Sequence, residues 1–269
     1  MKIIFLLWIL VLLISCDLGN KKSQNVNQPT EFENDVNAIF SKDTLKENDI
    51  IKVNPYHNGR LTENFEPNQK DFSKEFFELR TRDSNNFLDS LYRFNCSNIW
   101  LDQNENDGIL GLDYKYLTMK FNNIVKKDSV TYFIQGKSKV GKNICDFEGE
   151  IILKYAHKSK HTDLPNITQG SLAGIYELRE NAKQKYSGIF KGTFESFFLI
   201  DSLNNIHKDQ LFEYADIYYN NSFVGTWEGY KDKNIKKCIW GDERLPFTFD
   251  YDIGDGEMII NEKYLKNKN

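Results

Sequence analysis

Hydrophobic positions follow a different pattern in successive parts of the chain. Residues 3–14 form an unbroken apolar run. Residues 17–35 are polar and have no hydrophobic period, which predicts a flexible tether. In residues 36–97 many apolar side chains recur at three- and four-residue spacing, and this spacing predicts a small α or mixed segment. Within that segment we expect amphipathic helices over residues 71–82 and 84–93.

From about residue 98 the hydrophobic period changes to two, as in β-strands. The expected strands cover residues 114–126, 130–140, 144–157, 172–180, 185–201, 210–220, 223–230 and 257–261. Short polar turns separate several of them, which indicates an antiparallel meander. We therefore expect residues 98–269 to form one β-rich domain.

An aromatic-x-glycine pattern in these strands adds detail about the sheet. Residues two apart in a strand share a face, so one face of residues 185–201 should carry Tyr186, Gly188, Phe190, Gly192, Phe194, Ser196 and Phe198. Glycine weakens a strand unless a neighbouring ring or a bend uses the space. The pattern therefore predicts a mainly β fold, an antiparallel curled sheet that forms a barrel or a sandwich. The opposite face, with Lys191, Thr193 and Glu195, is expected to meet water.

The start of the chain has the features of an export signal. Lys2 precedes the apolar run, and the run is shorter than the roughly twenty residues that span a bilayer. The sequence Leu13-Ile14-Ser15-Cys16 resembles the lipobox of bacterial lipoproteins. The resemblance implies that residues 1–15 are removed as a signal peptide and that Cys16 carries diacylglycerol and an amino-terminal fatty acid such as palmitate. Ordinary cleavage near Cys16 is the alternative, and bulky Leu13 three positions before the cut argues against it.

The predicted lipidation of Cys16 would place the protein at a membrane. Residues 16–35 would be the lipidated tether, and the body would face the periplasm of a bacterium. The chain has 269 residues and a formal net charge of -4, with both signs interspersed. Nucleic-acid-binding proteins carry a concentrated basic patch, so we expect no nucleic-acid partner. The most basic stretch, residues 231–237, is expected to be a solvated loop.

The chain contains four cysteines, Cys16, Cys96, Cys145 and Cys238. If Cys16 carries lipid, at most one intramolecular disulfide can form, and an oxidising periplasm would permit it. Cys145 with Cys238 is the preferred pair, and three free buried thiols are the alternative.

Two acidic stretches are candidates for calcium. Asp250, Asp252, Asp255 and Glu257 could supply oxygen ligands from one loop, although their spacing departs from that of an EF-hand. Residues 102–108 also begin like a calcium loop, but their glycine comes one residue late. A solvated turn is the alternative for both stretches. We expect no other cofactor.

Five segments of the body carry a second resemblance: Gly136-Lys137-Ser138-Lys139-Val140, Phe147-Glu148-Gly149, Gly188-Ile189-Phe190-Lys191-Gly192-Thr193-Phe194, Cys238-Ile239-Trp240-Gly241-Asp242 and Asp252-Ile253-Gly254-Asp255-Gly256-Glu257. Through these segments, residues 108–265 resemble the β-rich C-terminal part of uncharacterised exported bacterial lipoproteins. That resemblance implies no known activity and no catalytic residue.

The sequence also lacks the nucleophile elbow, the phosphate loop and the dinucleotide-binding glycines of common enzyme classes. We therefore expect a non-enzymatic binding or interaction module at the cell envelope, with an envelope protein or glycan as its partner. Two alternatives stay open. One is a periplasmic hydrolase whose carboxylates meet only in the fold, and the other is a calcium-dependent recognition module.

Overall fold

The computed structural model describes residues 71–81, 86–101, 105–216 and 218–268. The expected signal peptide, Cys16 and the tether lie outside these residues. No helix within the described ranges is long and apolar enough to cross a bilayer.

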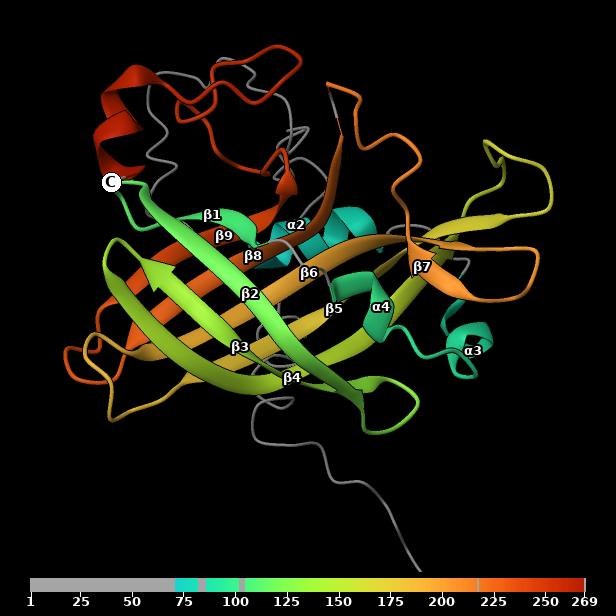
Figure 1. Ribbon diagram of the computed structural model, residues 1–269, viewed down its shortest axis with the longest axis horizontal. Helices are drawn as coiled ribbons and strands as arrows, with labels where there is room; N and C mark the ends of the chain where they lie inside the picture. The colour runs from blue at the N-terminus through green and yellow to red at the C-terminus, as the bar shows by residue number, and fades with distance from the viewer. Residues whose placement is uncertain (1–70, 82–85, 102–104, 217, 269) are drawn as a thin grey trace, which may run out of the picture.

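Eight antiparallel strands close into a barrel, and each pairs with the next strand of the ring along the chain (Figure 1). The ring consists of β1 (Asn106–Leu110), β2 (Lys115–Lys126), β3 (Thr131–Val140), β4 (Asn143–Lys158), β5 (Thr168–Glu180), β6 (Gly188–Ile200), β8 (Tyr219–Gly229) and β9 (Ile235–Glu243). Strand β9 pairs with β1 and closes the ring. Strand β7 (Ile206–Lys208) pairs with the end of β6 as an addition to it. The prediction of a mainly β, antiparallel curled sheet is confirmed, and the sheet takes the form of a barrel.

Most expected strands correspond to β2, β3, β4, β5, β6 and β8, although some ends differ by a few residues. The strand expected over residues 210–220 is wrong, because turns fill most of the chain between β7 and the start of β8. The strand expected over residues 257–261 is also wrong, since it contributes one isolated bridge between Asp252 and Ile260. Strands β1 and β9 were not expected.

The helices of the described ranges are short and lie mainly before the barrel in the chain. They are α2 (Ser73–Arg80), α3 (Leu88–Leu91), α4 (Ser97–Trp100) and a C-terminal 3-10 helix, η1 (Glu262–Lys268). Helix α2 confirms the helix expected over residues 71–82. The helix expected over residues 84–93 is reduced to α3, and residues 82–85 are not described. Helix α4 was not expected.

Aromatic rings fill the middle of the barrel. Phe223 stacks on Phe194 and on Trp240, with ring centroids 5.4 and 5.0 Å apart. The expected inward face of β6 is confirmed at Phe194 and its neighbours in the strand, but Tyr186 precedes β6 and is 80% exposed. Rings also occupy the space beside glycines, because a Cβ at Gly174 would lie 2.7 Å from the Phe194 ring.

One end of the barrel, on the right in Figure 1, is closed by the segment that carries α3 and α4. Trp100 of α4 packs edge-on against Tyr132 and Phe194, with centroids 5.2 and 5.8 Å apart. Its Nε1 donates a hydrogen bond of 2.8 Å to Ser196 Oγ. The Cys96 amide donates to the Tyr132 hydroxyl at 3.1 Å. Since Trp100 and Tyr132 are fully buried, this plugged end is filled by protein.

Helix α2 and the C-terminal segment cover part of the outer wall. Their apolar side chains form a second core with the outward residues of β1, β8 and β9: Phe72, Phe76, Ile109, Tyr114, Val224, Ile239, Leu245, Phe247 and Tyr251. The expectation that the outer face of β6 meets water is wrong at Thr193 and Glu195, because α2 packs there. Thr193 Oγ1 donates to the Ser73 carbonyl at 2.8 Å, and Arg80 Nε lies 2.9 Å from the Glu195 carboxylate.

Lys237 also belongs to this outer core, so the expected solvated loop over residues 231–237 is corrected at its end. Lys237 is 6% exposed. Its Nζ lies between 5.2 and 5.8 Å from the ring centroids of Phe72, Tyr114 and Phe249. Burial lowers the pKa of this amine to about 8.

Candidate functional site

The other end of the barrel, where the β1–β2, β3–β4, β5–β6 and β8–β9 turns meet, carries a cavity of about 350 Å³. We call this cavity the mouth. Each strand of the ring contributes to it: Leu110 (β1), Lys115 (β2), Ser138 and Val140 (β3), Asn143 (β4), Glu180 (β5), Phe190 (β6), Trp227 (β8) and Lys236 (β9). Lys142 and Tyr186 come from the turns. Strand alternation explains the set, because the last inward-facing residues of each strand surround the end of the barrel.

A buried carboxylate lies in the wall of the mouth. Glu180 is 5% exposed and accepts three hydrogen bonds. One oxygen accepts from Trp227 Nε1 at 2.9 Å and from the Gly188 amide at 2.7 Å, and the other accepts from the Ser138 hydroxyl. Burial raises the pKa of Glu180, while these hydrogen bonds act in the opposite direction. The carboxylate therefore fixes the Trp227 indole in position.

The thiol of Cys145 lies close to the same carboxylate. Asn143 Nδ2 donates to its sulfur at 3.3 Å. Burial and the neighbouring Glu180 charge raise the pKa of Cys145 to about 11. The thiol is therefore protonated at neutral pH and is a poor nucleophile.

The preferred disulfide between Cys145 and Cys238 is not formed. Cys145 contacts residues of the mouth, whereas Cys238 points into the middle of the barrel beside Tyr176. Cys96, Cys145 and Cys238 are all free and buried, which is the alternative that the sequence left open.

Three lysines, Lys115, Lys142 and Lys236, line the mouth together with one acid, Glu180. Within the described residues, none of the three ammonium groups forms an ion pair with a carboxylate. Lys236 Nζ lies 5.0 Å from the centroid of the Trp227 ring. The mouth therefore has a positive rim above a mostly apolar wall.

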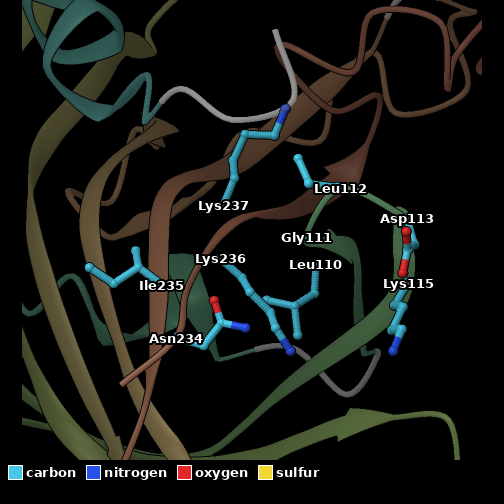
Figure 2. Close-up of a pocket in the computed structure, with 9 residues that line it drawn as sticks. All are labelled: Leu110, Gly111, Leu112, Asp113, Lys115, Asn234, Ile235, Lys236 and Lys237. Carbon is cyan, nitrogen blue, oxygen red and sulfur yellow. The ribbon is translucent and has the colours of Figure 1, made fainter. Parts of the chain in front are cut away.

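Figure 2 shows a second hollow, of about 420 Å³, between the β1–β2 turn and the β8–β9 turn. It shares Leu110, Lys115 and Lys236 with the mouth, so the two hollows are adjacent. In the figure the side chain of Lys237 extends in the opposite direction from that of Lys236. The adjacent hollow therefore shares Lys115 and Lys236 with the mouth and adds the carboxylate of Asp113.

The acidic C-terminal loop surrounds an arginine of the same chain. Arg244 is 5% exposed, and its Nε donates to Asp252 Oδ2 at 3.0 Å. Its other nitrogens donate to the carbonyls of Gly254, Asp255 and Gly256. Two of the predicted calcium ligands, Asp252 and Asp255, thus accept hydrogen bonds from the Arg244 guanidinium, Asp252 through its carboxylate and Asp255 through its carbonyl.

The other calcium candidates do not converge on one point. Asp250 pairs with Lys263 and accepts from the Tyr264 hydroxyl at 3.0 Å, while the side chains of Asp255 and Glu257 are exposed. In the second stretch, residues 106–108 belong to β1, and residues 102–104 are not described. Across the described residues, no group of three or more His, Cys, Asp or Glu side chains is arranged to hold a metal ion.

Sequence reasoning did not single out the residues of the mouth. The alternation of β2 to β6 places Lys115, Ser138 and Glu180 on inward faces, and this was the available signal. The mouth also needs residues of β1 and β9, which were not expected as strands. The chain matches no protein-family model, no curated protein and no solved structure.

Proposed function

We propose that the protein is a lipid-anchored, non-enzymatic binding module of the bacterial cell envelope, and that its mouth takes a small ligand. The observation that carries the proposal is the difference between the two ends of the barrel. Trp100 fills one end, and the other end has a cavity of about 350 Å³ bordered by every strand of the ring. Eight-stranded barrels have interiors just wide enough to be filled by side chains or to hold one small ligand.

The chemistry of the mouth favours binding over catalysis. Ligand sites are concave, mostly apolar and furnished with a few fixed polar groups, and they usually measure about 300–1,000 Å³. The mouth meets this description with Leu110, Phe190 and Trp227 in its wall. Glu180 is the one carboxylate in its lining, so no pair of acids meets there for hydrolysis.

The anchor is the second part of the proposal. Diacylglycerol and a fatty acid on Cys16 would hold the protein stably on the membrane, since two or more chains suffice for that. Residues 16–35 would let the barrel move within reach of the bilayer. The mouth would then sample ligands close to the membrane surface.

The binding part is tested by titrating the full-length protein with the neutral fluorescent probe N-phenyl-1-naphthylamine. We expect saturable binding at one site and energy transfer from tryptophan. Val140→Trp should abolish this binding, because Val140 lines the mouth and a larger ring would fill it. Leu164→Trp is the matched control, since Leu164 is 47% exposed on the β4–β5 loop. Equal binding by wild type and Val140→Trp would contradict the proposal.

The anchor is tested by metabolic labelling of producing cells with an alkyne analogue of palmitate. We expect label on the wild-type protein and none on Cys16→Ser. Cys96→Ser is the matched control, because Cys96 is buried in the body and should leave the label unchanged. Label on Cys16→Ser equal to that on wild type would exclude lipidation at this position.

A further inference from the structure

The charges around the mouth are unequal. Lys115, Lys142 and Lys236 lie in its lining against the single carboxylate of Glu180. The carboxylate is turned into the protein, where it accepts from Ser138, Gly188 and Trp227. Three ammonium charges therefore outweigh one carboxylate charge at the mouth, and the carboxylate oxygens already accept hydrogen bonds from the protein. Anionic groups are attracted to this rim and cationic groups are repelled.

The wall directly below the lysines is apolar. Leu110, Phe190 and Trp227 are exposed by 6%, 1% and 7%, so most of each side chain is packed and their remaining surface faces the mouth. Hydrocarbon that enters the mouth displaces water from this surface, which favours binding. The aromatic core below prevents deep penetration, because Phe190 packs against Trp240 with centroids 5.7 Å apart.

The positive group and the apolar wall are in contact at Lys236. Its Nζ lies 5.0 Å from the centroid of Trp227, and Leu110 lines the same cavity as both. A ligand whose charged head binds the lysine therefore has its apolar part against Trp227 and Leu110. The charged head and the apolar body of the ligand must therefore be adjacent, just as Lys236 is adjacent to the apolar residues of the wall.

From these observations we infer that the mouth selects amphipathic anions, molecules with a short apolar body and one carboxylate head or a similar acidic head. The inference rests on the proposed function and names the ligand class of the same site. The head would bind at Lys115 and Lys236, and the body would lie against Leu110, Phe190 and Trp227.

The test compares three eight-carbon probes that differ in their head groups: octanoate, octanol and octylamine. Each is titrated into the full-length protein by calorimetry. The indole N–H resonance of Trp227, assigned with Trp227→Phe, reports occupancy of the mouth because that N–H donates to Glu180. We expect octanoate to bind about tenfold more tightly than octylamine and to weaken as salt is added. Octanol should fall between the two.

The lysines are tested with a matched pair of double variants. Lys115→Gln with Lys236→Gln should weaken octanoate binding to the level of octanol and leave octanol binding within about twofold. Lys160→Gln with Lys266→Gln removes the same charge from exposed positions outside the mouth and should change neither probe. Octylamine binding as tightly as octanoate, or equal octanoate affinity in both double variants, would overturn the inference.

The probes also separate this inference from the proposed function. If octanol or octylamine moves the Trp227 resonance and octanoate binds no more tightly, the mouth is a binding site and the ligand class is wrong. If none of the three probes moves the resonance, the proposed binding function fails together with the inference.

Discussion

Arg244 and Asp252 form an ion pair that is almost wholly removed from water, with side-chain exposures of 6% and 1%. The pair is completed by hydrogen bonds on both sides. Arg244 donates to three backbone carbonyls of the following loop, and Asp252 Oδ1 accepts from the amides of Gly254 and Ile259. The C-terminal segment is thus folded around a cation that the chain itself supplies.

Replacing Arg244 with alanine should destabilise the protein by about 3–5 kcal/mol, because Asp252 would remain buried without its partner. Urea unfolding measures the loss. Arg179→Ala is the control, since the Arg179 side chain is 55% exposed and its pair with Glu177 should contribute little. Equal stability of Arg244→Ala and wild type would show that the pair does not hold the segment.

The sequence offered Asp250, Asp252, Asp255 and Glu257 as candidate calcium ligands, and the contacts of Arg244 argue against calcium binding there. We expect the melting temperature of the wild type to be the same in millimolar calcium and in chelator. Arg244 already supplies positive charge to the loop, and both oxygens of Asp252 accept hydrogen bonds. A melting temperature that rises with calcium would establish the metal site, because a ligand of the folded state stabilises it.

Much of the barrel could be predicted from strand alternation, and its closure could not. Strands β2 to β6 alternate inward and outward positions apart from register shifts in β2 and β4, as the aromatic and glycine residues of β6 illustrate. Strand β1 begins with Asn106, Asp107 and Gly108, which resemble a polar turn. Its local sequence does not favour a strand, and pairing with β9 holds it in the extended conformation. Local sequence does not reveal such a pairing, because the partners are distant along the chain.

Trp100→Ala should cost about 3–5 kcal/mol of stability, because it leaves a cavity at the plugged end and removes the donor to Ser196. The free energy of unfolding in urea is the measurement. Leu101→Ala is a suitable control, as Leu101 is 44% exposed and should change stability by less than about 0.5 kcal/mol. Similar losses in the two variants would argue against a plug at Trp100.

Glu195 should make stability depend on pH. Burial raises its pKa from 4.5 to about 7 in the folded protein, with the Arg80 charge opposing the shift. The folded state therefore holds a proton that the unfolded state releases between these values. The resulting stabilisation is complete below pH 4.5, declines as the pH rises to about 7 and is then lost.

The measurement is the free energy of unfolding of wild type and Glu195→Gln from pH 4.5 to 8, and the decline should be smaller in the variant. Glu148→Gln, at an exposed position of β4, should keep the wild-type pH profile. If the unfolding free energy of Glu195→Gln declined with pH in parallel with that of the wild type, Glu195 would not be the cause of the decline.

The candidate site was harder to predict than the fold for a specific physical reason. Lys236 and Lys237 are neighbours in a basic stretch, and both were expected in solvent. Because they alternate across β9, Lys236 lines the mouth and Lys237 packs among aromatic rings outside the barrel. Their different roles depend on β9 being a strand, and the charge pattern alone does not indicate that.

The pairing of β9 with β1 has a consequence for biosynthesis. The seam of the barrel joins its first and last strands, so β1 lacks a neighbour on one side until the ribosome has passed Glu243. Closure must await translation of β9 and requires contacts between distant segments, which fold slowly. A nascent chain in this condition has two open sheet edges, and premature termination before β9 would leave them permanently available for aggregation.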